Sequence, residues 1–405
     1  MPSRRAVVIG AGITGVLTAR ELLLRGWEVT VLEAAHIGAG SSSRTAAGIR
    51  QQFSTPGTVH GMQYCVRFYR DFAQEVLGGT CPIVQNGYLF LHDDEGSWAA
   101  AREVAAMQQA SGLEVEVLDG VQLLERFPWV AEGLVGGTFC GTDGFLLPHL
   151  VYNDGARRVR ELGGTLLANA GVTAARHEGG RLAEVVTPKG TFGADLFIDA
   201  TNAWTRRLAP LLLAEVLEVD PLKRYLWFLA RGGEMTADTL GGMPLVIGPG
   251  GGYCRPENRD TMLLGKKHDT PPMPMFTYED QDDVEADYAH DGGIDAYPYE
   301  LWAEMAEVIP ALESFDGFSA TTGGYYATTP DHNPFLGFDR QQSNLLRLVG
   351  FSGHGAMMGP FTAAVAAEMA DAGRDLDHIT LDGRTIALDA FRIGRAFDHS
   401  EAMVI

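Results

Sequence analysis

Three glycines near the start of the chain are spaced as in dinucleotide-binding loops. Gly10, Gly12 and Gly15 form a GxGxxG pattern between a short β-branched run and a helical stretch. The first glycine permits a tight turn, the second lets the backbone approach a pyrophosphate, and the third lets helix and strand pack closely. Glu33 ends the next apolar run, where its carboxylate can accept hydrogen bonds from ribose hydroxyls and would repel a 2′-phosphate. The combination predicts dinucleotide binding; the alternative is a glycine-rich turn beside a solvated glutamate.

The elements that must position these glycines follow from the hydrophobic pattern. Residues 6–9 are an apolar run of strand length, residues 13–25 have the spacing of a helix, and residues 29–32 form a second apolar run. Gly26 is placed to end the helix. This is one strand–helix–strand unit of a doubly wound sheet.

The rest of the chain suggests two domains. After a polar loop from Ser41 to Phe53 we expect helices at 59–77, 98–111, 150–162, 297–308 and 360–372, strands at 87–91, 165–168 and 195–200, a proline-rich loop at 271–274 and a last strand at 345–350. The fold class is therefore α/β. A discontinuous Rossmann-like nucleotide domain is expected over 1–82, 145–215 and 325–405, and a second α+β domain on a mostly antiparallel sheet over 83–144 and 216–324.

Composition narrows the range of partners. The chain has 405 residues, which is more than one core usually holds, and a formal net charge of -21. A surface this acidic repels phosphate backbones and anionic lipid, so neither nucleic acid nor a membrane surface is an expected partner. A local cation can still bind an anionic substrate.

The cysteines and the N-terminus favour a cytoplasmic protein. The four cysteines, Cys65, Cys81, Cys140 and Cys254, form no CxxC pair, so we expect small buried side chains rather than a metal site or a disulfide framework. Arg4 and Arg5 precede an apolar run, as in a secretory signal, but the run is only of strand length and no small-residue cleavage site follows.

Several later segments resemble the D-amino-acid oxidase superfamily of FAD enzymes, and within it the branch of sarcosine oxidase and the proline dehydrogenase β-subunit. The resemblance covers nearly the whole chain. The segments that carry it, in the same order as in the family, are 43–53, 87–91, 199–204, 323–331 and 350–360. It implies that the dinucleotide is FAD.

The resemblance also implies which residues surround the cofactor. The adenosine and pyrophosphate half would be held by Gly10, Gly12, Ile13, Thr14, Gly15, Glu33, Ala34 and Val172. The remainder of the cofactor would lie along Gly40, Ser41, Ser42, Arg44, Thr45, Ala46, Ala200, Thr201, Trp204 and Gly324, with Gly353, His354, Gly355 and Met357 near the flavin. In this family the start of the last helix approaches the flavin, where its positive end stabilises negative charge.

Arg50 is the residue for which the resemblance implies substrate binding. It matches the family arginine that pairs with the substrate carboxylate, which a guanidinium fork suits bidentately; the alternative is a surface ion pair. Tyr253, Tyr326, His354 and Met357 complete the expected catalytic group. The tyrosines, with Tyr325 as a further wall residue, could instead only pack, and His354 could be a structural histidine.

The sequence departs from the family at several positions. Gly324 stands where covalent sarcosine oxidases attach flavin to a cysteine, so FAD is expected to be noncovalent. Met357 replaces a lysine after the Gly-His-Gly loop, and Leu263 replaces the lysine that helps oxygen accept electrons, although Lys266 and Lys267 lie nearby. Arg224 lies near a position where the proline dehydrogenases have a histidine.

The leading hypothesis is FAD-dependent oxidation of the C–N bond of a small secondary or N-methyl amino acid, by hydride transfer to flavin N5 with imine formation. A D-amino acid or glycine is an alternative substrate. The electron acceptor is oxygen or another carrier, and in the second case the chain would be the β-subunit of a heteromeric dehydrogenase. A noncatalytic accessory flavoprotein is the remaining alternative.

Overall fold

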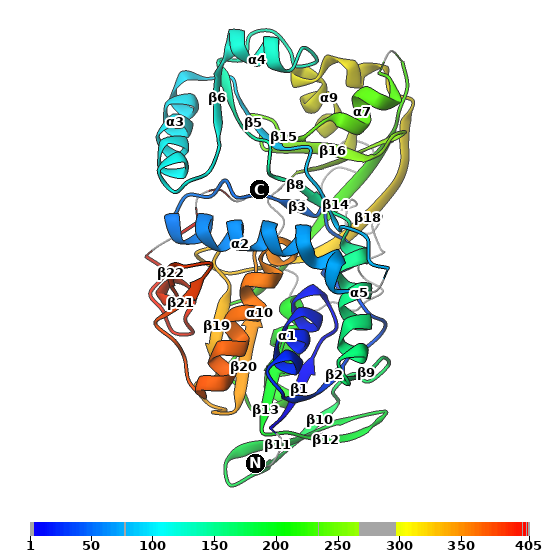
Figure 1. Cartoon of the computed structure of the whole chain (residues 1–405). Helices are drawn as coiled ribbons and strands as arrows, with labels where there is room; N and C mark the ends of the chain where they lie inside the picture. The colour runs from blue at the N-terminus through cyan, green and yellow to red at the C-terminus, as the bar shows by residue number, and fades with distance from the viewer. Residues whose placement is uncertain are drawn as a thin grey trace.

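Two large sheets and a helix between them form the framework of the protein. The computed structural model describes residues 4–266 except 77 and 234, residues 297–398, and residues 400, 401 and 403. The loop expected at 271–274 and Lys267 lie outside the described residues. One sheet has six strands and the other has eight. Figure 1 shows the first in the lower half of the view and the second in the upper half, with helix α2 (Pro56–Phe72) running between them.

The six-stranded sheet is built around the predicted strand–helix–strand unit. Its order is β19 (Phe335–Phe338), β20 (Leu345–Val349), β13 (Leu196–Asp199), β1 (Arg5–Ile9), β2 (Glu28–Leu32) and β9 (Thr165–Leu167). All neighbours are parallel except β19 and β20. The carboxyl ends of β1, β2 and β13 therefore meet at one edge, which is where ligands bind in sheets of this kind.

Both faces of this sheet are covered, which explains why β1 is apolar throughout. Ala6 and Val8 pack with helices α1 (Ile13–Leu24), α5 (Pro148–Glu161) and α10 (Gly355–Ala372). Val7 and Ile9 pack against the other face, where β11 (Arg181–Thr187) lies in a three-stranded sheet with β10 (Ala174–Glu178) and β12 (Gly190–Gly193). Strands buried on two faces read as continuous hydrophobic runs.

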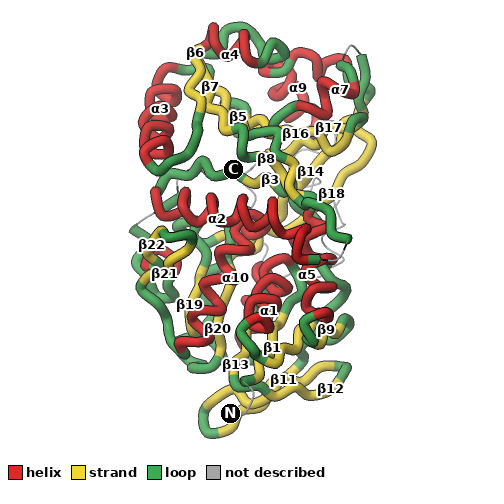
Figure 2. Tube along the Cα trace, in the orientation of Figure 1, coloured by secondary structure: helices red, strands yellow, loops and turns green. Residues whose placement is uncertain are grey.

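The eight-stranded sheet is mostly antiparallel, as predicted. Its order is β18 (Gly317–Thr328), β14 (Asp220–Ala230), β17 (Thr261–Lys266), β16 (Gly252–Asn258), β15 (Leu245–Ile247), β5 (Tyr88–His92), β7 (Gly136–Cys140) and β6 (Glu116–Asp119). Among the described strands of this sheet, only β15 and β5 are parallel neighbours. Around it lie α3 (Glu95–Ala110), α4 (Gly120–Arg126), α7 (Ala237–Gly242) and α9 (Tyr297–Val308) (Figure 2).

Short elements complete the described part of the chain. Strands β3 (Gly48–Ile49), β8 (Gly144–Leu146) and β4 (Ile83–Val84) form a small sheet, and β21 (His378–Leu381) pairs with β22 (Arg384–Ala387). Helix α6 (Thr205–Leu211) follows β13, and 3-10 turns occupy Ser41–Ser43, Ala73–Glu75, Asn202–Trp204, Pro310–Ser314 and Asp389–Phe391. None of the described helices has the length and apolar character needed to cross a bilayer.

The last long helix begins earlier than predicted. From the sequence we expect this helix at 360–372, but α10 begins at Gly355 and Pro360 lies inside it. Pro360 has no N–H to donate to the carbonyl of Ala356, four residues before it. The hydroxyl of Tyr69 donates to that carbonyl instead, at 2.5 Å. A tertiary contact thus satisfies the acceptor that the proline leaves open.

Other predictions need smaller corrections. The strand at 345–349 is not the last, since the β21–β22 hairpin follows it. Helix α2 begins at Pro56, where Thr55 caps it, and ends at Phe72 rather than at residue 77. Cys81 is exposed, unlike the three other cysteines. Gly26 does end α1, with a φ of 80° that only glycine adopts freely.

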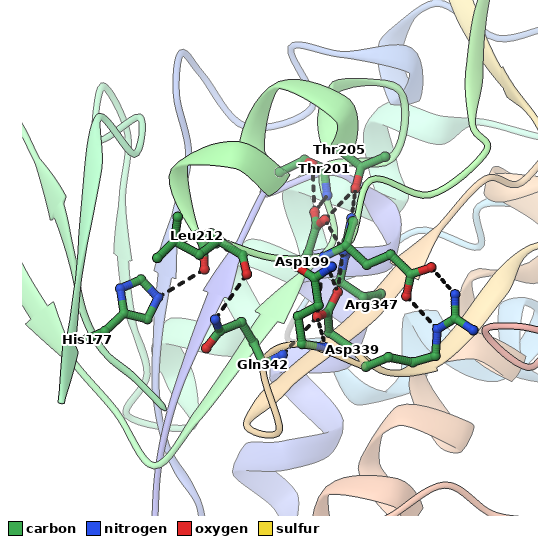
Figure 3. Close-up of polar contacts among 12 residues, drawn as sticks. His177, Asp199, Thr201, Thr205, Leu212, Asp339, Gln342 and Arg347 are labelled. Carbon is green, nitrogen blue, oxygen red and sulfur yellow. Dashed lines mark hydrogen bonds and ion pairs between the residues drawn. The ribbon is translucent and has the colours of Figure 1, made fainter. Parts of the chain in front are cut away.

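A buried ion network joins the strands of the six-stranded sheet (Figure 3). Arg347 on β20 is fully buried, and its guanidinium binds Asp199 at 3.0 Å and Asp339 at 2.7 Å. Asp199 also accepts hydrogen bonds from the backbone N–H and the hydroxyl of Thr201, at 2.9 and 2.6 Å. The network fixes the turn that follows β13, at the edge where the parallel strands end.

Replacement of Arg347 by leucine should destabilise the protein strongly. The variant leaves two buried carboxylates without their cation, which typically costs about 3–5 kcal/mol. The measurement is chemical unfolding of the parent, of Arg347→Leu and of Arg259→Ala, which removes an exposed ion pair with Asp238. Equal stability of the two variants would contradict this reading of the network.

Candidate functional site

Two adjoining cavities lie at the edge where β1, β2 and β13 end. The larger one encloses about 1360 Å³ between its walls, part of it open to solvent. Its wall includes the glycine-rich turn, the carboxylate of Glu33, the segment 40–45, the turn 200–204 and the start of α10. The smaller one encloses about 450 Å³ and shares Thr45, Tyr326 and Gly353 with the larger. A long ligand in the first can therefore present one end to the second.

The glycine-rich turn admits no side chains. A Cβ at Gly15 would lie 1.9 Å from the carbonyl oxygen of Gly10, and a Cβ at Gly10, whose φ is 107°, would lie 2.7 Å from that of Ala200. At Gly12 it would lie 2.8 Å from the hydroxyl of Ser42. The turn is thus as close to its neighbours as a pyrophosphate cradle requires.

Glu33 is buried and held in place at the cavity wall. Its carboxylate accepts hydrogen bonds from the backbone N–H groups of Ala11 at 2.8 Å and Ala35 at 2.9 Å. These bonds fix the carboxylate between the glycine turn and the next loop. In this position its oxygens can accept further hydrogen bonds from a pair of hydroxyls.

The segment from Gly40 to Thr45 forms another wall of the larger cavity. The Ser42 hydroxyl accepts a hydrogen bond from the backbone N–H of Ile13, at the start of α1, at 3.0 Å. The guanidinium of Arg44 donates to the carbonyl of Gly323 at 3.2 Å. Arg44 therefore links this wall to β18 in addition to lining the cavity.

The start of α10 lies where the two cavities meet. His354 is the N-cap residue, and Gly355 and Ala356 line the larger cavity while Met357 lines the smaller one. The first backbone N–H groups of a helix have no partner within the helix and carry partial positive charge. A Cβ at Gly353 would lie 2.5 Å from the ring of Tyr326, so the glycine makes room for that ring.

All five side chains predicted to act on the substrate line the smaller cavity. They are Arg50, Tyr253, Tyr326, His354 and Met357. The other lining residues are Thr45, Ala46, Ala47, Gly48, Tyr88, Leu245 and Gly353. These residues come from the small sheet, the eight-stranded sheet and α10, so the cavity lies between the two halves of the protein.

Arg50 is the cation of this cavity and is fully buried. Its guanidinium carbon lies 4.6 Å from the ring centre of Phe53, 5.5 Å from that of Phe90 and 5.8 Å from that of Tyr88. Nη2 donates to the carbonyl of Met403, whereas Nε and Nη1 have no hydrogen-bond partner among the residues that the structure describes. The surface ion pair considered as an alternative is thus wrong, and buried donors remain for an anionic ligand.

Asp143 supplies a counter-charge behind Arg50. It is fully buried and accepts hydrogen bonds from the backbone and side-chain N–H groups of Gln51, both at 2.9 Å, and from the Gln52 side chain at 3.2 Å. Burial raises its pKa to about 6, against the lowering effects of these bonds and of Arg50. The carboxylate thus supports Gln51 and Gln52, which follow Arg50, and it is not among the residues that line the smaller cavity.

His354 is neutral at physiological pH. Burial, and to a smaller extent the charge of Arg50, lower its pKa to about 3. Burial raises the pKa of Tyr326, although the nearby charge of Arg224 and a hydrogen bond with the Tyr253 side chain act in the opposite direction. The cavity thus combines one fixed positive charge with neutral polar and aromatic groups.

Most of the residues predicted to hold the cofactor line the two cavities. The exceptions are Gly15, which packs on Gly10, and Gly324, where a Cβ would lie 2.7 Å from the Cβ of Arg44. Leu263 packs with Tyr88, Leu245 and Tyr253, which line the smaller cavity.

Sequence reasoning missed several contributors. Asn202 lies inside a recognised segment and binds the backbone N–H of Gly350 at 3.0 Å, but it was given no role. Asp143 and Gly265 lie in no recognised segment. A Cβ at Gly265 would lie 2.4 Å from the Tyr253 ring across the strand pair, so this glycine lets the ring lie flat.

Comparisons with known proteins point to a flavin. The family model described as DAO, FAD dependent oxidoreductase, matches residues 5–369. FAD-dependent oxidoreductase domain-containing protein 1 of Bos taurus is 27% identical, and the alignment covers 91% of this chain and 82% of the relative. Glycine oxidase of Bacillus licheniformis is 23% identical over 90% of this chain and 92% of its own.

Solved structures agree with this match. The crystal structure of L-proline dehydrogenase from P. horikoshii has a TM-score of 0.80 and 28% identity, covering 95% of this chain and 96% of that one. Glycine oxidase from Geobacillus kaustophilus has a TM-score of 0.79 at 22% identity, which shows the shared fold. The predicted cofactor, FAD, is confirmed, and the glycine cradle and the buried Glu33 fit its adenosine and pyrophosphate half.

Replacement of Gly15 by alanine should weaken FAD binding. The new Cβ would collide with a main-chain oxygen and displace the turn, so affinity should fall at least about tenfold, or roughly 1.4 kcal/mol. Gly242→Ala is the matched control, because nothing lies within 4 Å of its Cβ position. Flavin content is read from absorbance; equal content in both variants would contradict the cradle.

His354 should make stability dependent on pH. An imidazole kept neutral contributes stability that is present above its unfolded pKa near 6.5 and is lost as the pH falls toward about 3. Asp143 has a raised pKa, so its contribution to stability is present at low pH and is lost as the pH rises toward about 6, which is the opposite dependence. His354→Asn should lower the loss of stability between pH 6.5 and 4.5, by up to about 1.4 kcal/mol per pH unit. Chemical unfolding of the holoprotein at several pH values tests this, and an unchanged slope would contradict it.

Proposed function

We propose a substrate class on the premise that this chain belongs to the DAO family of FAD-dependent oxidoreductases. The protein oxidises the C–N bond of a small amino acid, and the favoured class is a secondary or N-methyl amino acid of the sarcosine or proline type. The names of two relatives, glycine oxidase and L-proline dehydrogenase, support an amino-acid substrate. Glycine and D-amino acids remain the alternative substrates.

The observation that carries the proposal is the pair of unpartnered donors on Arg50. A buried N–H group without a partner costs about 1–3 kcal/mol, and more when it is charged. A carboxylate in the smaller cavity would accept hydrogen bonds from Nε or Nη1 and neutralise the charge. Arg50 would thus bind the carboxyl group and orient the rest of the amino acid.

The surroundings of Arg50 favour the reactive form of the amine. The carbon next to the nitrogen can release a hydride only when the amine is neutral. Burial and the charge of Arg50 both disfavour an ammonium group, and neutral His354 offers it no counter-charge. FAD, when bound, supplies the hydride acceptor. The aromatic rings of Tyr88, Tyr253 and Tyr326 would exclude water, and the imine product would hydrolyse after release.

The environment of Leu263 supports an electron acceptor other than oxygen. Leu263 is buried among apolar side chains at the position of the oxygen-activating lysine of the relatives. Lys266 pairs with Glu304 of α9 and points to the opposite face of β17 from Leu263. A partner chain that accepts electrons belongs to this dehydrogenase proposal.

An anaerobic absorbance titration of the holoprotein tests the proposal. Sarcosine, L-proline, glycine and D-alanine are each compared with the matching amine that lacks the carboxyl group. The proposal expects one amino acid to bleach the flavin, its decarboxylated analogue to fail, and air to restore the colour slowly. Fast restoration would indicate an oxidase. If none bleaches it, the accessory-flavoprotein hypothesis would take precedence.

Replacement of Arg50 should weaken binding of that amino acid. Arg50→Met should raise KM at least about tenfold, because charge-assisted hydrogen bonds contribute roughly 1.5–3 kcal/mol each. The KM of Arg50→Lys should lie between the KM values of the parent and of Arg50→Met, since an ammonium group keeps the charge but lacks the planar fork. Arg102→Met removes an exposed arginine that lies over Trp98 and serves as control. Steady-state kinetics decides, and an unchanged KM in Arg50→Met would exclude the carboxylate role.

A further inference from the structure

The segment near the end of the chain contacts Arg50, one of the residues that line the smaller cavity. Arg395 binds both carboxylate oxygens of Asp331 at 2.7 Å, and this pair is almost fully buried. Further along, the backbone N–H of Glu401 donates to the carbonyl of Asp331 at 3.1 Å. Asp331 follows β18, which carries Tyr326, so the segment is fastened beside the wall of the smaller cavity.

Glu401 anchors the segment from the other side. It is 4% exposed, and its Oε1 accepts hydrogen bonds from the backbone N–H of Ser54 at 3.1 Å, the Ser54 hydroxyl at 2.6 Å and the backbone N–H of Met403 at 3.0 Å. Ser54 lies four positions after Arg50. One buried carboxylate therefore ties the end of the chain to the loop that carries the substrate-binding arginine.

The segment then contacts Arg50 itself. The Met403 carbonyl accepts the hydrogen bond from Nη2, and the Met403 sulfur lies 3.7 Å from the side-chain nitrogen of Gln108. The two forks of a guanidinium pair Nη2 with either Nη1 or Nε. Because one N–H of Nη2 donates to the Met403 carbonyl, this carbonyl covers one side of the guanidinium. The unpartnered donors Nε and Nη1 remain for a ligand.

We propose that Glu401 and Met403 form a strap that determines substrate specificity; this proposal rests on the proposed carboxylate role of Arg50. The strap closes the cavity behind the carboxylate, so a short acid fits between Arg50 and the flavin side. An acid whose chain continues by one peptide unit past the carboxylate position, on the side away from the flavin, collides with the strap. The strap also keeps water from Arg50, which strengthens its attraction for the short carboxylate.

Two carboxylate probes test the strap without requiring turnover. The holoprotein is titrated with acetate and with N-acetylglycine, and binding is read from the difference absorbance of the flavin. The parent should bind acetate more tightly than N-acetylglycine. A chain that stops after Asp398 should bind acetate more weakly and should lower the ratio of the two dissociation constants at least tenfold.

A second variant guards against loss of folding in the shortened chain. Glu401→Ala removes the anchor but keeps the chain length, and it should shift the ratio in the same direction by a smaller factor. Ser400→Ala, at an exposed neighbour, should leave the ratio unchanged. Flavin content and unfolding midpoint are recorded for each variant.

The outcomes separate the strap from the proposed function. If acetate binds and Arg50→Met abolishes its binding, the carboxylate role stands. If the ratio then stays the same in the shortened chain and in Glu401→Ala, the strap inference is overturned. If Arg50→Met binds acetate as well as the parent, the carboxylate role fails, and with it the basis for the strap.

Discussion

A guanidinium withdrawn from water is the feature on which the rest of this account depends. Arg50 is fully buried where the two halves of the protein meet, and a buried charge is tolerated only with partners. The guanidinium of Arg50 lies over three aromatic rings, and the negative charge of Asp143 lies near enough to interact with it. The carbonyl of Met403 accepts one hydrogen bond from it. Two donor nitrogens, Nε and Nη1, have no partner among the described residues, so the folded chain offers a preformed site for an anion.

In the proposed arrangement, the six-stranded sheet places the oxidising cofactor next to Arg50. Parallel strands deliver the glycine turn, Glu33 and the turn after β13 to one edge, and the buried network of Arg347 fixes the last of these. The cavity at that edge shares Tyr326 and Gly353 with the cavity of Arg50. Helix α10 begins at the junction, so its positive end lies where the two cavities meet.

Some parts of this arrangement could be predicted from the residue pattern, and others only from a resemblance to a family. The glycine pattern is local and each of its members has a steric reason, so the turn and the sheet could be derived from it. The proposed role of Arg50 rests on a family resemblance, because nothing in the neighbouring sequence indicates that this arginine is buried.

The residues that hold Arg50 and its loop in place could not be identified from the sequence. Asp143 meets Gln51 across 92 positions, and Met403 meets Arg50 across 353. Contacts of that range leave no period or spacing in a single chain. The start of α10 was misplaced for a similar reason, because the Tyr69 hydroxyl that makes Pro360 tolerable comes from another helix.

The most direct test is a crystal structure of the FAD-bound protein with a carboxylate that lacks an amine, such as acetate. This account predicts a carboxylate in the smaller cavity that accepts hydrogen bonds from Nε or Nη1 of Arg50, beside the flavin. A carboxylate bound elsewhere, or a guanidinium that contacts only protein groups while acetate occupies another site, would contradict the central claim.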